Sequence, residues 1–387
     1  MSWNATLQAA AVKLRVLHCI YDDPRNPWVA GGGAVRVFEL YRRLTNEVDV
    51  TVLTGRYPGA RDETIAGVRY RRLGEAGPYG WSRLSYAWAA NRVLRREAYD
   101  AAVFDFSTYT PIFMPSARPV GITVHHVSGP TARERWGAVG GRGLVALERS
   151  MLRRSRCFSA TSTATRALLE QIAPAGSEIH LVYAGVPDEL FALPRAEGDY
   201  LLYFGRLDVF QKGLDTLLHA VARLARERPG VELRLAGRGK DTDRVRQLAA
   251  ELGIAENVRL LGAVSEEERQ RLFAGARVML MPSRFEGFGM VAAEAMAAGV
   301  PLVAAAAGSL PEVVAEGGVL VPLSDAGALA AAVTRLLEAP AERQALSAAA
   351  RRAAERFRWE SVARQHLAFL HRIAHAGRST LATNGTP

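Results

Sequence analysis

Short apolar runs alternate with longer amphipathic stretches along most of this sequence. One series begins with the run at residues 14–21 and continues to about residue 182, and a second continues from residue 200 to residue 304. Apolar runs of four to eight residues separated by helix-length stretches predict βαβ units, which build a parallel sheet with helices on its faces. The two series therefore predict two doubly wound α/β domains.

The segment between the two series, residues 184–199, carries proline and glycine and follows neither period, which indicates a linker. A chain of 387 residues also exceeds one ordinary core, and its length alone favours two or three domains. After the second series, helical patterns continue to about residue 374. We predict two Rossmann-like domains at residues 1–190 and 191–357. A C-terminal helix at residues 358–376 and a disordered tail at residues 377–387 follow them.

Composition is that of an ordinary globular protein, with 49% apolar and 23% charged residues. No run of about 18 uncharged apolar residues occurs, so no transmembrane helix is expected. The N-terminus lacks a basic region followed by an apolar core, so no signal peptide is expected. Cys19 and Cys157 both lie in apolar, strand-like runs. Buried reduced thiols and a cytoplasmic location are the expectation.

The net charge of +10 is concentrated in the N-terminal half, where residues 1–195 hold 25 Lys and Arg against 17 Asp and Glu. This excess suits an anionic membrane surface or an acidic substrate, and it equally suits solvated arginines on helix faces. No nucleic-acid-binding motif accompanies it, so no nucleic-acid partner is expected. If the charge serves a peripheral membrane contact, the arginine groups 69, 71, 72 and 92, 95, 96 could form the basic face.

Glu286 and Glu294 define the most informative motif of the second series. The buried-strand pattern of residues 278–281 precedes Glu286, a glycine-bearing loop follows, and a helical pattern runs over residues 290–298 with Glu294 in its first turns. Ligands of open α/β sheets bind at the carboxyl ends of strands, and a helix N-terminus there suits a phosphate. Two carboxylates beside it suit the hydroxyls at both ends of a nucleotide-sugar.

Two further constellations carry positive or anion-binding groups. Arg206 and Lys212 lie just after the first strand of the second series, where two cations can neutralise a diphosphate leaving group. Gly31, Gly32 and Gly33 precede the first helix of the chain, where glycines let backbone N–H groups approach an anion. The glycines do not follow the dinucleotide-binding spacing, and a flexible turn remains the alternative for them.

Other candidate residues are less specific. Asp241 and Asp243 match a D-x-D pattern, but an aspartate at a helix start is more often a cap, and no other set has metal-ligand spacing. His125 and His126 end a strand, where one could contact a sugar or phosphate or simply bond to backbone. Trp81, Trp88 and Trp136 could mark an acceptor groove or core, and the apolar side of its helix favours core for Trp88.

Together these residues resemble one family. The segment from Glu286 to Glu294 is similar to the E-x7-E signature of retaining GT-B glycosyltransferases of family four. Phe204-Gly-Arg206, Lys212-Gly213, Gly31–Gly33 and Leu310-Pro-Glu-Val-Val314 match the family's further motifs in order. The resemblance covers about residues 14–372. It implies two Rossmann-like domains that face a central cleft, with the last helix crossing back to the first domain.

The resemblance also implies roles for individual residues. Arg206 and Lys212 would hold the diphosphate of the donor. Glu286 would hold hydroxyls of the transferred sugar, and Glu294 those of the ribose. Backbone amides of Phe288, Gly289, Met290 and Val291 would meet sugar and phosphate. Gly32 and Gly33 would approach the phosphate and acceptor, and His125 the donor sugar.

By this resemblance the protein would move a hexose from a UDP- or GDP-linked donor to a hydroxyl acceptor, without cofactor or metal and with retention at the anomeric carbon. Two segments depart from the family pattern, Ala184-Gly-Val-Pro187 and Gly308-Ser-Leu-Pro-Glu312. The alternatives are a non-hydrolysing sugar-nucleotide epimerase and a catalytically silent nucleotide-sugar-binding protein. The intact set of two cations and two glutamates argues against the silent protein.

Overall fold

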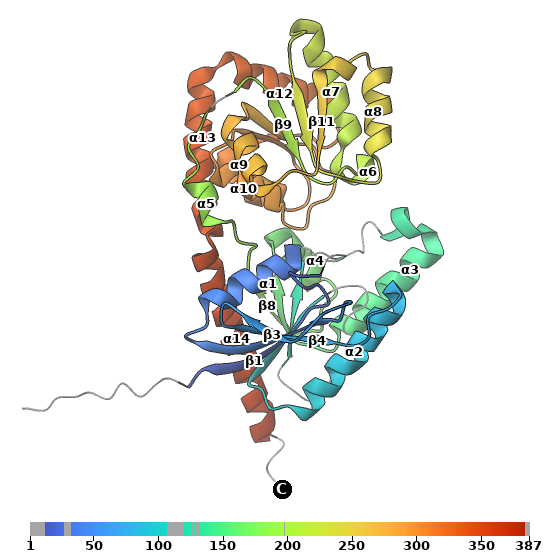
Figure 1. Ribbon diagram of the computed structural model, residues 1–387, viewed down its shortest axis with the longest axis vertical. Helices are drawn as coiled ribbons and strands as arrows, with labels where there is room; N and C mark the ends of the chain where they lie inside the picture. The colour runs from blue at the N-terminus through green and yellow to red at the C-terminus, as the bar shows by residue number, and fades with distance from the viewer. Residues whose placement is uncertain are drawn as a thin grey trace, which may run out of the picture. The chain divides into compact units, whose positions relative to one another are not determined.

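The computed structural model describes residues 12–26, 32–106, 120–125, 127, 132–196 and 198–383. The chain forms two compact units, and each is built around a sheet of mostly parallel strands (Figure 1). The first unit comprises residues 1–160, 168–182 and 363–387, and the second comprises residues 161–167 and 183–362. The second unit's long segment thus begins at residue 183, before the predicted boundary at 190.

In the described part of the first unit, eight strands form one sheet in the order β3-β4-β2-β1-β5-β6-β7-β8, with only β3 antiparallel to its neighbour. The strands are β1 (Leu14–Cys19), β2 (Val48–Gly55), β3 (Glu63–Ile65), β4 (Val68–Leu73), β5 (Ala101–Asp105), β6 (Val120–Val124), β7 (Cys157–Ala160) and β8 (Glu178–Leu181). The helices are α1 (Gly32–Arg43), α2 (Tyr79–Arg96), α3 (Ala132–Leu152) and the end of α4 (Thr163–Glu170).

The second unit has a six-stranded parallel sheet in the order β11-β10-β9-β12-β13-β14. Its strands are β9 (Leu201–Phe204), β10 (Leu233–Ala236), β11 (Val258–Gly262), β12 (Val278–Met281), β13 (Leu302–Ala305) and β14 (Gly318–Val321). Its helices are α5 (Asp188–Phe191), α6 (Val209–Lys212), α7 (Leu214–Glu227), α8 (Thr242–Glu251), α9 (Glu266–Gly275), α10 (Met290–Ala297), α11 (Leu310–Val314), α12 (Ala326–Glu338) and α13 (Pro340–Ala354). Short 3-10 turns lie at Ala255–Asn257, Ala315–Gly317 and Glu355–Phe357. Helix α14 (Trp359–Thr383) starts here and continues in the first unit.

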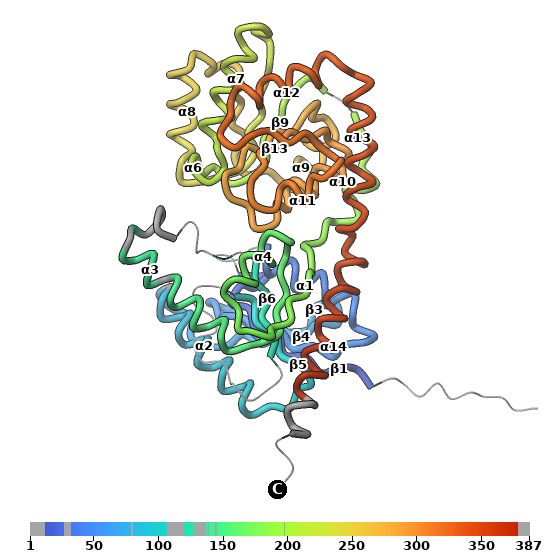
Figure 2. The backbone as a smooth tube through the Cα atoms, turned by 180° about the vertical axis from the view of Figure 1, so that it is seen from behind, coloured from blue at the N-terminus to red at the C-terminus, as the bar shows by residue number. Residues whose placement is uncertain are grey.

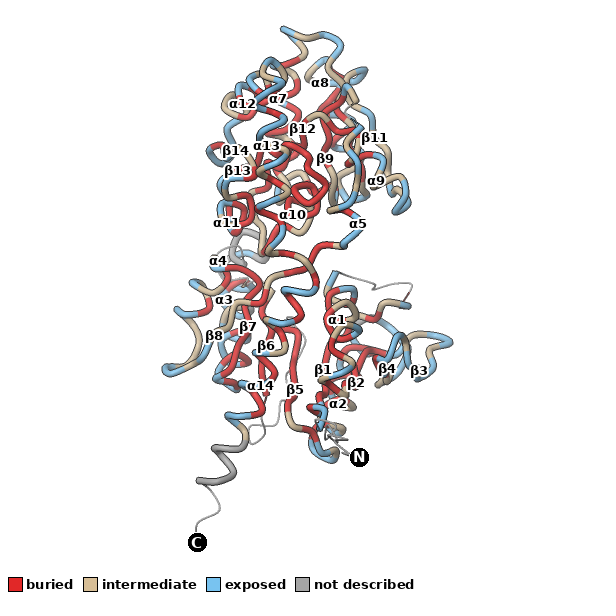
Figure 3. The backbone as a smooth tube through the Cα atoms, turned by 90° about the vertical axis from the view of Figure 1, so that its left-hand side faces the viewer, coloured by how far each residue is buried: buried red, intermediate tan, exposed pale blue. Residues whose placement is uncertain are grey.

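The central strands are buried on both faces, as Figure 3 shows by their colour. Every residue of β5, β6, β7, β12 and β13 is buried. Parallel strands covered by helices on both sides read as continuous apolar runs rather than alternating ones, which is the pattern found in the sequence. Polar groups of these segments are therefore concentrated where the strands end.

Helix α14 packs on the sheet of the first unit beside β6, and Figure 2 shows it running along that unit. A Cβ atom added at Gly121 would lie 2.3 Å from the Cδ1 atom of Ile373. The helix continues to Thr383, although residues 377–387 were predicted to be disordered. Gly377 does not end it, because a glycine costs an established helix only about 1 kcal/mol relative to alanine. Residues 384–387 lie outside the described part.

Two other sequence expectations differ from the structure in the first unit. Trp88 is 63% exposed rather than in the core. The buried face of α2 is set by Tyr86, Ala90 and Leu94, and Trp88 lies about 200° around the helix from Tyr86. Short β3 and helix α4 were not expected from the sequence.

The arginines on β4 do not form a free basic face. Arg72 is fully buried and pairs with Asp23, at 2.8 Å between Nε and Oδ2. Arg69 pairs with Asp49 at 2.8 Å, and Arg71 pairs with Glu97 at 2.7 Å. Arg72 therefore cannot belong to an exposed basic face, whereas Arg69 and Arg71 are 50% and 35% exposed and paired with acidic residues. A membrane contact through this group stays a prediction.

The expected linker is an ordered part of the second unit. Val186 forms a parallel bridge with Arg358, and its N–H donates to the carbonyl oxygen of Phe357 at 2.8 Å. Gly185 lies against the buried indole of Trp359, where an added Cβ atom would be 2.2 Å from the ring atom Cε3. The chain therefore enters this unit beside the first residue of α14, at a position with no room for a side chain.

We expect Gly185→Ala to lower the free energy of unfolding by about 1–3 kcal/mol, because the added methyl group overlaps a large, rigid ring. Chemical denaturation measures the loss. Gly230→Ala is the matched control, since no atom lies within 4 Å of its added Cβ atom. Equal stability of the two variants would contradict the packing described for Gly185.

Candidate functional site

The strand order of the second unit fixes where a ligand site can form. From the central pair β9 and β12 the chain proceeds outward in opposite directions, through β10 to β11 and through β13 to β14. At such a reversal the loops that follow the two strands diverge to opposite faces and leave room at the carboxyl edge. Arg206 follows β9, and Glu286 follows β12. Both sequence-predicted residues therefore belong to the edge where ligands of this architecture bind.

Lys212 and Glu286 are brought together at this edge. The Nζ atom of Lys212 lies 2.5 Å from the Oε1 atom of Glu286, and the two side chains are 18% and 11% exposed. Lys212 ends the one-turn helix α6, which Asp208 caps by accepting a hydrogen bond from the N–H of Gln211 at 2.9 Å. The pair is a charge-assisted contact at the predicted phosphate and sugar position.

Gly213 lets the α6 turn approach the end of β12. Its backbone is left-handed, with φ of 63°, and a Cβ atom there would lie 2.1 Å from the carbonyl oxygen of Pro282. Both constraints require glycine. The close approach explains why the sequence has Lys212 directly before a glycine, because it is this turn that carries the lysine to Glu286.

Arg206 occupies a more exposed position. Its Nη2 atom donates to the Oε1 atom of Gln211 at 3.0 Å, and its carbonyl oxygen accepts from the hydroxyl of Tyr203 at 2.9 Å. No ion pair joins Arg206 to an acidic residue in the described part of the chain. At this edge Lys212 is therefore paired with Glu286, whereas the guanidinium of Arg206 is held by the side-chain amide of Gln211.

The loop from Glu286 to α10 is held by contacts to its backbone and by packing of Phe288. Gly289 begins α10 with φ of 88°, and no side chain of the described residues caps this helix start. The hydroxyl of Ser162 donates to the carbonyl oxygen of Gly287 at 2.8 Å. Phe288 is buried against Tyr183 and Phe357, whereas Met290 and Val291 are half-buried. The helix N-terminus is thus fixed, and its N–H groups suit an anion.

Glu294 does not contact Glu286 but points to a different partner. Its carboxyl oxygen Oε2 lies 2.9 Å from the Nη1 atom of Arg269 on α9, and its side chain is 9% exposed. Burial raises the pKa of Glu294, and the guanidinium of Arg269 opposes that rise. The E-x7-E spacing thus places two carboxylates in different environments, each beside its own cation.

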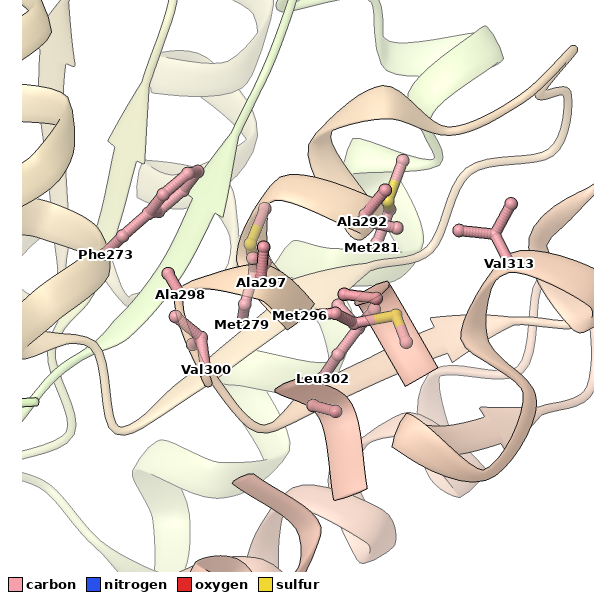
Figure 4. Close-up of a cluster of buried hydrophobic side chains, with 14 of the residues drawn as sticks. Phe273, Met279, Met281, Ala292, Met296, Ala297, Ala298, Val300, Leu302 and Val313 are labelled. Atoms are coloured by element: carbon pink, nitrogen blue, oxygen red, sulfur yellow. The ribbon is translucent and has the colours of Figure 1, made fainter. Parts of the chain in front are cut away.

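Helix α10 is fixed from behind by apolar packing. Figure 4 shows its alanines and Met296 among side chains from β12, β13 and α9, including Met279, Leu302 and Phe273. All of these residues are buried almost completely. Because small side chains let α10 lie close to the sheet, the helix carries Glu294 and the Gly289 turn on a rigid support.

In the first unit, a second group of polar residues lies at the carboxyl ends of β1, β5 and β6. Asp105 ends β5 and is 5% exposed, and its Oδ2 atom lies 3.1 Å from the Nε2 atom of His125. Its Oδ1 atom lies 3.3 Å from the Nε2 atom of His18. A Cβ atom at Gly33, in the first turn of α1, would be 3.8 Å from Oδ2. Gly33 and His125, both predicted from sequence, are therefore neighbours of one buried carboxylate.

This cluster extends to α14 through Tyr41. The Tyr41 hydroxyl lies 2.9 Å from Nδ1 of His18 and 3.1 Å from Nε2 of His366. The single proton of the Tyr41 hydroxyl can serve only one of the two histidines, so Tyr41 donates to one imidazole and accepts from the other. The cluster therefore links β1, α1 and α14 through polar contacts.

Burial and neighbouring charges set the ionisation of Asp105 and His366. Burial opposes ionisation of Asp105, but His125 and His18 outweigh it and hold the pKa of Asp105 well below its usual range. Burial, the cation of Arg36 and His18 hold the pKa of His366 well below its usual range. At neutral pH Asp105 is an anion and His366 is uncharged.

Several other predicted residues can now be placed. Asp241 does not cap α8 with its side chain; its Oδ2 atom accepts from the N–H of Val209 at 2.8 Å instead. Asp243 is exposed and pairs with Arg246 at 2.7 Å. Among the described residues, no group of three or more His, Cys, Asp and Glu side chains could hold a metal ion. Gly31, His126 and the side chain of Trp136 lie outside the described part.

Asp105 and Arg269 were missed by the sequence reasoning. Asp105 had a usable signal, because an acidic residue directly after a buried strand lies at the ligand-binding edge of a parallel sheet. Arg269 had none: it lies three residues after Glu266 on a surface helix, where the expected partner is Glu266 itself. Only the packing of α9 beside α10 shows that it reaches Glu294.

Two Rossmann-like units, each with polar residues at the carboxyl edge of its sheet, are the architecture of GT-B proteins, and this chain has that architecture. Two family models match the chain, one described as Glycosyltransferase Family 4 over residues 30–190 and one as Glycosyl transferases group 1 over residues 188–353. A D-inositol 3-phosphate glycosyltransferase of Frankia alni is 33% identical over 384 residues, which cover 87% of this chain and 93% of that protein. The chain therefore belongs to the group 1 glycosyltransferases.

Other relatives agree with this family. An MMP alpha-(1->4)-mannosyltransferase of Mycolicibacterium hassiacum is 37% identical over 270 residues, which span 65% of this chain and 64% of that protein. Sucrose-phosphate synthase from Thermosynechococcus elongatus has a TM-score of 0.78 at 25% identity and covers 94% of this chain and 100% of its own. Anabaena HepE in complex with UDP and glucose, at 19% identity, has a TM-score of 0.70 with 92% and 99% coverage and shares the fold.

Group 1 glycosyltransferases use nucleotide-sugar donors, so membership of this family implies a nucleotide-sugar donor and an acceptor. The relatives favour neither the epimerase nor the silent binding protein.

The buried histidine of α14 leads to a pH prediction. In the unfolded chain a histidine has a pKa of about 6.5, whereas the pKa of His366 in the folded protein is far lower. The unfolded state therefore binds a proton that the folded state does not, and stability falls as pH decreases below about 6.5, by up to about 1.4 kcal/mol per pH unit. Denaturant unfolding between pH 7 and pH 5 measures this slope.

His366→Gln should flatten that slope because it removes the titrating group, even if it lowers the stability at pH 7. His219→Gln, at an exposed histidine of α7, should leave the slope unchanged. An undiminished slope in the His366 variant would contradict the burial of an uncharged imidazole.

Proposed function

We propose that this protein is a retaining hexosyltransferase that moves a hexose from a UDP- or GDP-linked donor to a hydroxyl group of a glycan, a lipid-linked acceptor or a small molecule. The observation that carries the proposal is the contact between Lys212 and Glu286 at the reversal point of the second sheet. It brings a phosphate-binding cation to a sugar-binding carboxylate, as donor recognition requires. The near full-length relative that is named a glycosyltransferase supports it.

In this proposal the second unit stabilises the leaving group. Negative charge develops on the diphosphate as the glycosidic bond breaks, and Arg206, Lys212 and the N-terminus of α10 stabilise it. Because these groups supply the positive charge, the reaction needs no metal ion. Donor binding replaces the direct contact between Lys212 and Glu286, so that the ammonium meets phosphate and the carboxylate accepts from sugar hydroxyls.

The first unit contributes Gly32, Gly33 and His125 to the reaction. Asp105 holds the Nε2 side of His125, which fixes the orientation of the imidazole toward the donor sugar. No side chain of the described residues is assigned as a covalent nucleophile, and we propose front-face displacement in which the donor phosphate takes the acceptor proton. Ordering both substrates then supplies much of the rate enhancement.

The test is transfer from UDP- and GDP-hexoses by the purified protein, after a thermal-shift screen selects the donor that stabilises it. Lys212→Ala should lower kcat about 100-fold or more, because it removes a cation that stabilises the transition state. Glu286→Ala should abolish most transfer through loss of sugar contacts. Lys240→Ala is the matched control, since Lys240 follows the neighbouring strand β10 and is 73% exposed.

The control should retain full activity. Unimpaired transfer by both the Lys212 and Glu286 variants would remove these residues from the proposed site. Absence of transfer from every donor and acceptor by a folded wild-type protein would remove the function itself.

We also propose peripheral contact with an anionic membrane, through one face of α2. Trp81, Leu84 and Trp88 are 55%, 51% and 63% exposed and share that face, with a spacing of three and four residues. Exposed Arg92 and Arg95 continue it, and the Arg92 guanidinium lies 6.0 Å from the centre of the Trp88 ring. Tryptophan beside arginine suits the boundary of an anionic lipid layer. None of the described helices is long and apolar enough to span a bilayer.

Sedimentation with vesicles that contain anionic phosphatidylglycerol tests this contact at low salt. The wild type should bind, and Trp81→Ser with Trp88→Ser should lose most binding, because insertion of two indoles and attraction to the lipid act together. Leu323→Ser, at an exposed leucine of the second unit, is the control and should bind as the wild type does. A wild type that stays in the supernatant would remove the proposal.

A further inference from the structure

Arg269 is a buried cation that the reaction proposed above does not use. It lies on α9 with its side chain 14% exposed, and its Nη1 atom is 2.9 Å from Oε2 of Glu294. On its other side, Nε and Nη2 lie 3.1 and 2.6 Å from Oε1 of Glu266. The guanidinium carbon also lies 5.9 Å from the centre of the Phe273 ring. Arg269 is thus held in one orientation by three neighbours.

Glu294 lies where a negative charge is unfavourable, so its cationic partner affects its ionisation. Glu294 lies on α10, where residues 292–297 are buried, and its own side chain is only 9% exposed, which disfavours a charge. Burial raises the pKa of Glu294, the charge of Glu266 adds to that rise, and Arg269 opposes it without reversing it. Without that cation, the physically favoured state of this side chain is the uncharged acid.

We propose that Arg269 is a positioning residue that keeps Glu294 ionised and oriented to accept hydrogen bonds from the ribose hydroxyls of the donor. The inference rests on the proposed function, because it takes the ribose as the ligand of Glu294. An ionised carboxylate accepts two hydroxyl hydrogen bonds more strongly than a carboxylic acid, which has one donor and weaker acceptors. Donor affinity at neutral pH therefore depends on a residue that touches no part of the donor.

Arginine suits this role because its planar fork can contact two carboxylates at once and stays charged when buried. Glu266 is 59% exposed and so retains much of its hydration, while it orients the guanidinium toward Glu294. Two acidic side chains thus share one cation, and the buried one has no other ion pair in the described residues. Loss of the arginine would leave Glu294 as an unpaired buried acid.

The experiment compares Arg269→Gln, which removes the charge at similar size, with Arg269→Lys, which keeps the charge. Calorimetry measures the Kd of UDP and GDP, and of their 2′-deoxy and 3′-deoxy forms, from pH 6 to pH 9. Arg269→Gln should weaken binding of the preferred ribonucleotide about tenfold or more near pH 7, which is the usual strength of a hydrogen bond to a charged group. Arg271→Gln is the control, because Arg271 pairs with Glu268 on the same helix and is 71% exposed.

Three results support the inference together. The affinity of Arg269→Gln for the ribonucleotide should recover as pH rises and Glu294 ionises, whereas the wild type should already be at its plateau at neutral pH. The preference for ribose over deoxyribose should shrink in Arg269→Gln and persist in Arg269→Lys. In turnover with a donor, the donor KM should rise while kcat changes little, since the contact is equal in ground and transition states.

A purely structural role would lower the melting temperature and weaken all the nucleotides equally at every pH, and that outcome would overturn the inference. Wild-type affinity in Arg269→Gln would overturn it as well. Carbon-13 NMR of labelled glutamate carboxyls, without nucleotide, gives a separate readout. If neither UDP nor GDP binds the wild type, the proposed function fails. If the NMR titration of Glu294 is the same in the wild type and in Arg269→Gln, the charge assignment fails, whether or not a nucleotide binds.

Discussion

Burial of both faces of two parallel sheets is the constraint on which the rest of this molecule depends. A strand that is apolar on both sides has no room for polar chemistry along its length, so functional groups are displaced to the strand ends. In each unit they gather at the carboxyl edge, where the strand order reverses. Asp105 directly ends β5, and Arg206 and Glu286 follow β9 and β12. The fold itself thus determines which edge of each sheet is chemically active.

The carboxylates at these edges each have a polar partner within the protein. Glu286 contacts Lys212, Glu294 contacts Arg269, and Asp105 contacts two histidines. A carboxylate in a partly buried position would otherwise carry a large desolvation cost. A ligand that takes the place of such a partner would exchange one set of polar contacts for another. Such an exchange costs less than creating charges at the moment of binding.

The sequence predicted the architecture well and the site in part. Apolar runs such as residues 278–281 became strands almost residue for residue, because burial on both faces leaves a pattern that needs no tertiary information. The positions of Lys212, Glu286 and Glu294 followed from strand, glycine and helix order. The partner of Glu294 did not follow, because Arg269 reaches it through a contact between two different helices. In the first unit, Asp105 had a signal at the end of β5 that the sequence reasoning did not use. Trp88 was misplaced for a related reason: an apolar residue on a helix does not reveal which of its faces the sheet covers. The helical end of α14 was also missed, since small polar residues fix no local structure.

Lys212 and Arg269 are cations of different chemistry, and this difference suits the roles proposed for them. Lys212 is a single-point charge on a flexible stem, placed at the end of a one-turn helix and in contact with a carboxylate that it can leave. Arg269 is locked between two carboxylates and an aromatic ring on a longer helix. In the proposed reaction Lys212 moves from Glu286 to a phosphate, and an ammonium suits this because it demands less precise geometry of its partner. Arg269 is proposed to hold Glu294 in one ionisation state, and a rigid, planar guanidinium suits that role. Exchange of lysine and arginine between these positions would therefore impair both, although each substitution preserves the charge.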